Sequence, residues 1–186
     1  MDVTKILEHD HDEAAALLDE IEAAEGAARQ PLIDELTTAL RAHMELEESV
    51  VYPRMKPVTG GKEVKEGFTE HELARKVLAD LNELAPDKPG FGAALAELKA
   101  GITHHVDEEE NEVFPELRTD GKKVLADMAT PFMTKRVELG MPTSAEALEA
   151  ASKKDELVAE AKAAGVDAAS SMTKGELAEA LAANLS

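Results

Sequence analysis

Cysteine is absent from this chain of 186 residues. Its absence excludes disulfides, iron–sulfur clusters, thiolate metal sites and cysteine nucleophiles. A chain without cysteine suits a reducing compartment, so we expect a cytoplasmic protein. No apolar run approaches the roughly 20 residues of a membrane span. The start, Met1–Lys5, also lacks the basic stretch followed by an apolar one that would indicate a signal peptide. We therefore expect no association with a membrane.

Aromatic residues make up only 3% of the chain, and basic residues are outnumbered by acidic ones, 20 to 39. The resulting formal net charge of -19 keeps the protein soluble, repels nucleic acid and attracts cations. Alanine, leucine, glutamate and lysine are abundant, whereas β-branched residues are few. This composition favours helices over strands.

Helical periodicity extends from about residue 4 to about residue 118 and is broken into four segments. We expect helices over residues 4–26, 31–55, 63–85 and 91–118. The breaks between the later segments fall at Pro57, Gly60 and Gly61, and again at Pro86, Pro89 and Gly90. Long helices joined by short loops predict an all-α protein, with an up-down-up-down four-helix bundle over residues 1–120.

The pattern changes after Gly121. We expect an additional helix over 122–138, in which Pro131 produces a kink or a break, within a connecting segment 121–143. Gly140, Pro142, Thr143 and Ser144 are typical of a linker. Two short helices are then predicted at 152–164 and 173–183, which makes residues 144–186 a small helical module.

Four of the six histidines fall on the apolar stripes of the four bundle helices: His11, His43, His71 and His105. Each helix thus directs one imidazole inward. By the same register, His9 and His104 are expected to lie on polar faces. A single histidine on an apolar face is more often an ordinary core residue, but one on each of four helices favours a shared site.

An internal repeat strengthens this interpretation. Residues 43–53 and 105–115 both read His-x3-Glu-Glu-x3-aromatic-Pro. One helical turn separates each histidine from the first glutamate, so Glu47 and Glu109 should also point inward. Buried carboxylates without a partner cost several kcal/mol, and neither stripe carries a lysine or arginine. A pair of metal ions would neutralise them, and imidazole with carboxylate suits iron, manganese or zinc.

Three further residues of the repeats have two interpretations each. Glu48 and Glu110 could accept hydrogen bonds from the imidazole rings, or they could lie on a solvated rim. Tyr52 could contact the metal, although its ordinary role would be a packing aromatic before Pro53.

Residues 1–118 resemble the hemerythrin-like (HHE) cation-binding family through Asp10-His11, the two repeats and Glu70-His71. The resemblance implies two non-haem iron ions bridged by two carboxylates and an oxo or hydroxo group. Manganese or zinc could replace the iron. Carried over, the terminal ligands are His11, His43, His71 and His105, and the bridging ligands are Glu47 and Glu109.

One position departs from the oxygen-carrying members of this family. They have a second histidine four residues after the one on the third helix, where this chain has Arg75. About two of the twelve octahedral positions then stay open. This argues against reversible oxygen carriage and favours reaction with dioxygen, peroxide or nitric oxide. A second hypothesis is an iron sensor or storage protein.

The tail resembles the helix-loop-helix module of the Rho N-terminal and SAP-like type. The resemblance lies in 154–157, 165–166 and 172–177. Such modules often touch nucleic acid, but residues 151–186 hold four lysines against six acidic residues. This charge argues against tight binding to phosphates. An adaptor role for the tail, or a purely structural one, is the third hypothesis.

Overall fold

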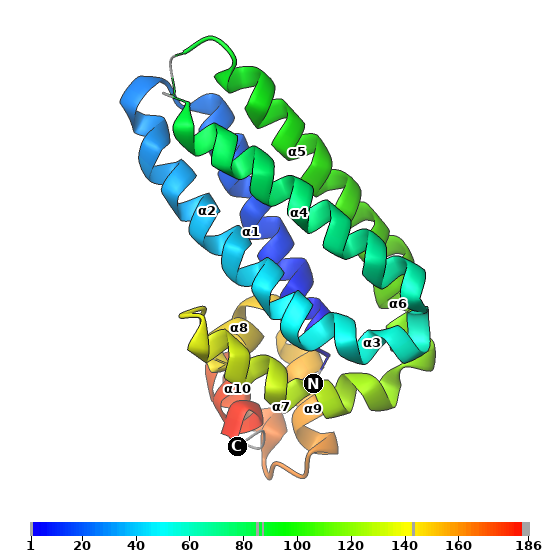
Figure 1. Ribbon diagram of the computed structural model, residues 1–186. Coiled ribbons are helices and arrows are strands. Elements are labelled where there is room, and N and C mark those ends of the chain that lie inside the picture. Colours follow the sequence, from blue (N-terminus) through cyan, green and yellow to red (C-terminus); the bar gives the residue numbers. More distant parts are fainter. Residues whose placement is uncertain (1, 85, 87, 143, 184–186) are drawn as a thin grey trace.

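The computed structural model describes residues 2–84, 86, 88–142 and 144–183, and within these ranges all regular structure is helical. Four long helices lie side by side and alternate in direction (Figure 1). They are α1 (Val3–Ala23), α2 (Arg29–Leu46), α4 (Gly61–Glu83) and α5 (Phe91–Glu108). The predicted all-α up-down-up-down bundle is therefore confirmed.

Both repeats contain a π-helical turn that the sequence analysis did not foresee. The first, Glu47–Val51, joins α2 to α3 (Tyr52–Thr59), and the second, Glu109–Val113, joins α5 to α6 (Phe114–Asp120). In each turn the backbone N–H of the aromatic residue donates to the carbonyl five residues earlier, that of Glu47 or Glu109. The proline after each aromatic residue then occupies the first turn of the following helix, where a missing N–H is tolerated.

The break predicted at Pro57, Gly60 and Gly61 is present only at Gly60, and Pro131 does not break its helix. Pro57 lies inside α3, and a single residue, Gly60, separates α3 from α4. Gly60 has a φ of 98°, which few residues other than glycine adopt. Pro131 likewise lies inside α7 (Lys122–Glu138), which continues past it. Prolines alone were therefore poor markers of helix ends in this chain. A short 3₁₀ turn, Gly26–Ala28, connects α1 to α2.

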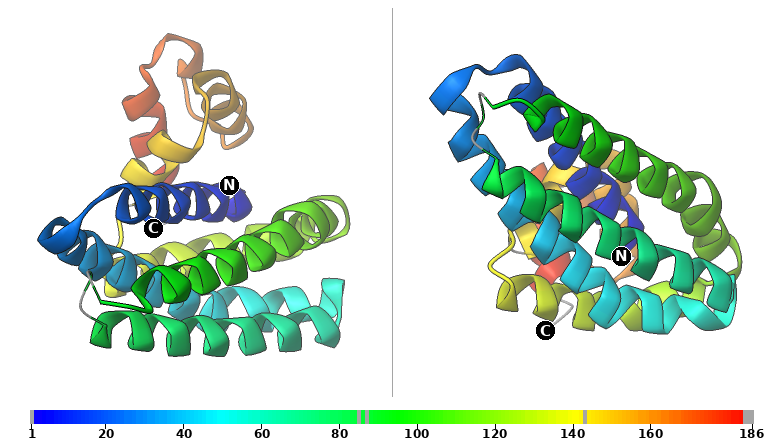
Figure 2. Two further views of the ribbon diagram at one scale, coloured as in Figure 1. Left: turned by 90° about the horizontal axis from the view of Figure 1, so that it is seen from above. Right: turned by 45° about the horizontal axis from the view of Figure 1, so that its top comes forward.

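The C-terminal helices gather around the start of α1, on its side away from α4 and α5 (Figure 2). They are α8 (Ser144–Ala151), α9 (Lys154–Ala163), the 3₁₀ turn Ala169–Ser171 and α10 (Lys174–Ala183). The sequence analysis expected the last two helices but missed α8, because it assigned Ser144 to a linker. Of the other predicted linker residues, Gly140 and Pro142 lie between helices, and Thr143 falls outside the described residues.

The hydrophobic core consists of two clusters. One fills the far half of the bundle, with Leu18, Leu36 and Leu98 among its members. The other joins the start of α1 to helices α3 and α6–α10, and includes Ile6, Phe132 and Leu177. The C-terminal helices thus share a continuous core with the bundle. The polar residues of the predicted site lie between these two clusters.

No helix in the described part of the chain is both long enough and apolar enough to cross a bilayer.

Candidate metal centre

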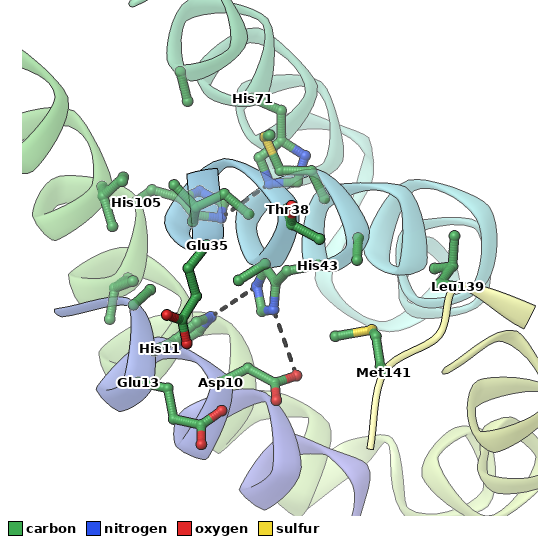
Figure 3. A pocket seen from close by; sticks show the side chains of 18 of the residues that line it. Asp10, His11, Glu13, Glu35, Thr38, His43, His71, His105, Leu139 and Met141 are labelled. Carbon is green, nitrogen blue, oxygen red and sulfur yellow. Dashed lines mark hydrogen bonds and ion pairs between the residues drawn. The ribbon is translucent and has the colours of Figure 1, made fainter. Parts of the chain in front are cut away.

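Four imidazole rings, one from each long helix, converge inside the bundle. The rings of His11 and His43 form one pair, with their Nε2 atoms 3.2 Å apart. The rings of His71 and His105 form a second pair, also with a separation of 3.2 Å between Nε2 atoms. All four side chains are buried. The structure thus brings together the histidines that the apolar stripes selected (Figure 3).

Two buried carboxylates lie between the histidine pairs. The Oε2 atom of Glu47 is 3.3 Å from Nε2 of His43 and 3.2 Å from Nε2 of His71, so it faces both pairs. Oε2 of Glu109 is 3.5 Å from Nε2 of His11 and 3.6 Å from Nε2 of His105. Each glutamate therefore stands between one ring of each pair.

These carboxylates have buried oxygens with no hydrogen bond among the described residues: both of Glu47 and Oε2 of Glu109. A buried carboxylate oxygen without a hydrogen-bond partner destabilises the fold unless a bound ion or water molecule interacts with it. Potential metal-binding atoms lie within 4.8 Å of one another in two groups of three residues. One group is His11, His43 and Glu47, and the other is Glu47, His71 and His105. Two metal ions would supply the missing partners, so the residues fit a dinuclear site.

The outward nitrogen of three of these rings meets a carboxylate. Nδ1 of His11 lies 2.8 Å from Glu110, Nδ1 of His71 lies 2.9 Å from Glu48, and Nδ1 of His105 lies 2.8 Å from Glu70. Such contacts fix the proton on Nδ1 and leave Nε2 free to bind a metal. For Glu48 and Glu110, the structure thus selects the imidazole-partner interpretation over the solvated rim.

The partner role of Glu70 was missed. Its position beside His71 in the sequence was noted, but it serves the histidine of the neighbouring helix, His105. Contacts across helices depend on how the helices are rotated against one another. No spacing within one helix reveals that rotation.

The fourth ring has a different arrangement. Nδ1 of His43 is 3.6 Å from Oδ2 of Asp10, too far for a hydrogen bond. Asp10 instead accepts hydrogen bonds from both Nη atoms of Arg136, a residue of α7 that is 1% exposed. The additional helix α7 therefore reaches the site through a buried arginine, a contribution that the sequence analysis did not identify.

Arg75 does not enter the centre. Its guanidinium lies 2.8 Å from Oε1 of Glu48, the carboxylate behind His71. The position that carries a further histidine in oxygen carriers thus holds a cation outside the cluster of buried imidazoles.

Each π-helical turn places an aromatic ring against an imidazole. Tyr52 stacks on His71, and its hydroxyl is 3.1 Å from Nε2 of that ring and 3.4 Å from Oε1 of Glu109. Phe114, the matching residue of the second repeat, stacks on His11 with ring centroids 6.0 Å apart. The two halves of the site are therefore related by pseudosymmetry, but only the His71 half has a hydroxyl group.

The remaining histidines lie away from this centre. His9 is partly exposed and 3.4 Å from Glu13. The exposed His104 lies beside Glu70 and Glu108 at 3.6 and 3.5 Å. These three residues could approach a common cation, but they are near the surface.

Without metal, the charges in the site are balanced by protons. Burial alone would lower the pKa of His43, but the carboxylates of Glu47 and Asp10 raise it to about 10. The pKa of His105 is also raised, because Glu109 and Glu47 outweigh its burial. Burial and the charge of Glu47 raise the pKa of Glu109, whereas nearby imidazoles lower that of Glu47. Metal binding must therefore displace protons from this centre.

Comparisons with known proteins agree with this geometry. Residues 2–117 match the family described as the hemerythrin HHE cation binding domain. An uncharacterized hemerythrin-like protein of Schizosaccharomyces pombe is 35% identical over 79 residues, which are 41% of this chain and 39% of that protein. A DNA nickase of Nostoc sp. is 25% identical over 121 residues, which are 64% of this chain and 34% of that protein. The chain thus spans little more than a third of either relative, and no solved structure matches it.

Proposed function

Because the chain belongs to the hemerythrin HHE cation binding domain family, we propose that it is a non-haem di-iron protein that reacts with dioxygen, peroxide or nitric oxide in the cytoplasm. A role in the response to oxidative stress would follow from such reactivity. In this proposal His11, His43, His71 and His105 are terminal ligands, and Glu47 and Glu109 bridge the two ions.

One observation carries the proposal: two carboxylates with unsatisfied oxygens are enclosed by four imidazoles in the middle of an apolar bundle. The proposed reactions require a change of oxidation state, which iron can undergo and zinc cannot, so they favour iron over zinc. Manganese would use the same ligands.

The surrounding residues would control what reaches the metals. Hydrogen bonds from Nδ1 to Glu48, Glu70 and Glu110 hold three rings in one tautomer. The Tyr52 hydroxyl points at the His71 half, where it can donate a hydrogen bond to a bound small ligand. In the metal-free protein, burial and the carboxylate of Glu47 raise the pKa of this hydroxyl, so it keeps its proton there.

The test is the reactivity of the iron-loaded protein. We expect peroxide or nitric oxide to change its visible absorption spectrum, with repeated turnover of peroxide if the protein is an enzyme. The Tyr52→Phe variant should bind the same amount of iron and react at a different rate. Iron-loaded protein whose spectrum is unchanged by dioxygen, peroxide and nitric oxide would contradict the proposal.

An iron sensor or storage protein is the alternative. All four long helices would contribute ligands, so loss of the metal ions would remove a link between them and leave the buried carboxylates to be balanced by protons alone. A sensor would lose helix content or thermal stability on chelation and show no turnover. Circular dichroism before and after metal removal separates this role from that of an enzyme.

A third possibility gives the C-terminal helices an adaptor role, as the resemblance to Rho N-terminal and SAP-like modules would suggest. The Nostoc relative named as a DNA nickase makes nucleic acid worth testing. The net charge of -19 opposes binding to phosphates. We expect the full chain neither to nick supercoiled plasmid nor to retard DNA at physiological salt. Retardation without nicking would favour the adaptor, whereas nicking would indicate a nuclease.

A further inference from the structure

A cavity of about 470 Å³ opens directly beside the four imidazoles. His11, His43, His71 and His105 all line it, together with apolar residues such as Leu40, Met44 and Ile102 (Figure 3). A diatomic ligand needs roughly the space of one or two water molecules, at about 30 Å³ each. The cavity instead has the size and apolar lining of sites that hold small organic molecules.

Small residues on all four long helices create this space. Ala14, Ala42, Ala74 and Gly101 line the cavity, one on each helix. Gly101 is exposed, and a Cβ atom added there would meet nothing within 4 Å, so it marks the open side of the cavity. Protein interiors usually fill such gaps, because an empty apolar cavity destabilises the fold. An occupant would restore the lost contacts.

Part of the wall comes from outside the family-matched residues 2–117. Leu139 and Met141 approach from the segment that follows α7, and Figure 3 shows them across the pocket from Glu13. Gly140, with a φ of 71°, allows the chain to turn between them. The shape of the cavity therefore depends on the C-terminal part of this chain.

The entrance is negatively charged. Glu13, Asp34 and Glu35 are exposed residues of the lining. Asp10 and Glu70 lie deeper in, where Arg136 and His105 pair with them, and the described lining itself contains no lysine or arginine. A carboxylate ligand would be repelled at this entrance, whereas a cationic group would be attracted.

We propose that the cavity binds a small organic cation with an apolar body, held by its chain against the apolar walls and by its charge at Glu13 and Glu35. The inference rests on the proposed function only in placing this molecule next to the metal ions, as a substrate or effector of that centre. Binding itself follows from the shape and charge of the cavity.

The experiment compares three probes by isothermal titration calorimetry on the metal-loaded full chain: n-octyltrimethylammonium, 1-octanol and octanoate. The quaternary ammonium cannot ligate a metal, so its binding reports on the cavity alone. We expect it to bind at least about tenfold more tightly than octanoate, with octanol between them. Equal or tighter binding of octanoate would overturn the inference.

Two matched variants locate the binding. Ala74→Leu places a larger side chain in the cavity and should weaken binding of the ammonium probe by about tenfold or more. Ala79→Leu makes the same change on an exposed position of the same helix and should have no effect. The double variant Glu13→Gln/Glu35→Gln should reduce the preference for the cation over octanol. Unchanged affinity in Ala74→Leu would overturn the inference.

Metal content, measured on each sample, separates the two proposals. If the chain holds no iron but binds the ammonium probe as described, the proposed di-iron function fails and the cavity assignment stands. If it holds iron and does not bind the probe, only the cavity assignment fails.

Discussion

Tyr52 reaches the centre because its neighbour on α4 is a glycine. An ideal Cβ at Gly67 would lie 2.6 Å from the Tyr52 hydroxyl and 2.8 Å from Cζ of the same ring. Any larger side chain at position 67 would therefore collide with the ring of Tyr52, which is only 1% exposed. Gly67 lies inside α4, which runs through it from Gly61 to Glu83.

Gly67→Ala should therefore push the Tyr52 hydroxyl away from His71. We expect a loss of about 1–3 kcal/mol in the free energy of unfolding, because the buried ring must shift. The visible spectrum of the metal-loaded protein should change, and its rate of reaction should shift in the same direction as that expected for Tyr52→Phe. Gly92→Ala, where an added Cβ meets nothing within 4 Å, is the control. Identical spectra for Gly67→Ala and the wild type would refute this account of the glycine.

Arg136 is the second residue whose role depends on burial. It is 1% exposed and binds Asp10, which is itself largely buried beside His43. Arg118 of α6 forms comparable ion pairs with Asp2, which precedes α1, and with Glu8, which lies on α1. Its side chain, however, is 33% exposed. The two arginines thus form a natural comparison between a buried and a partly exposed ion pair.

Arg136→Met should cost about 3–5 kcal/mol, because it leaves the Asp10 carboxylate buried without its cation. Arg118→Met should cost about 1 kcal/mol or less. Chemical denaturation measures both values. The double variant Asp10→Asn/Arg136→Met should recover part of the loss. Similar losses for the two single variants would show that Arg136 has no special role at the site.

At the scale of helices, the sequence was sufficient to predict the four-helix bundle and the inward direction of its four buried histidines. Both follow from the 3.6-residue period, and α1, α2, α4 and α5 lie close to where that period placed them. The same period failed after Glu47 and Glu109. In an α-helix, a residue five positions later faces away, but in a π-helical turn it returns to the same face. Tyr52 and Phe114 point inward for this reason.

A signal for these turns was present in the repeat itself. Pro53 and Pro115 follow long helical runs, and a proline within an α-helix clashes with the carbonyl four residues earlier. A wider turn just before the proline relieves this conflict. By contrast, nothing in the sequence linked Arg136 to Asp10, because this contact joins residues 126 positions apart.

At the scale of the whole molecule, the buried imidazoles and carboxylates of the candidate centre lie between two hydrophobic clusters. The metal-free protein must balance its buried carboxylates with protons on His43 and His105. These pKa values are raised above those of the unfolded chain, so the folded state retains protons that the unfolded state releases. Glu109, whose pKa is also raised, acts in the same direction.

The free energy of unfolding of the metal-free protein should therefore fall as the pH rises from about 6 towards 10. Glu47 and His11 act in the opposite sense, because their pKa values are lowered and their contributions to stability are lost as the pH falls. Thermal melts should show Tm highest in mild acid and lower by about 5 °C or more at pH 9. The metal-loaded protein should lack this alkaline decline, since metal ions replace the protons. A flat profile for the metal-free protein would contradict the proton balance.

The central claim is that Glu47, Glu109 and the four buried histidines hold two metal ions. Elemental analysis of iron in the purified wild type and in Glu47→Ala, His105→Ala and His9→Ala tests it most directly. We predict about two iron ions per chain in the wild type and in His9→Ala, and a strong reduction in the other two variants. Equal iron content in all four proteins would contradict the account.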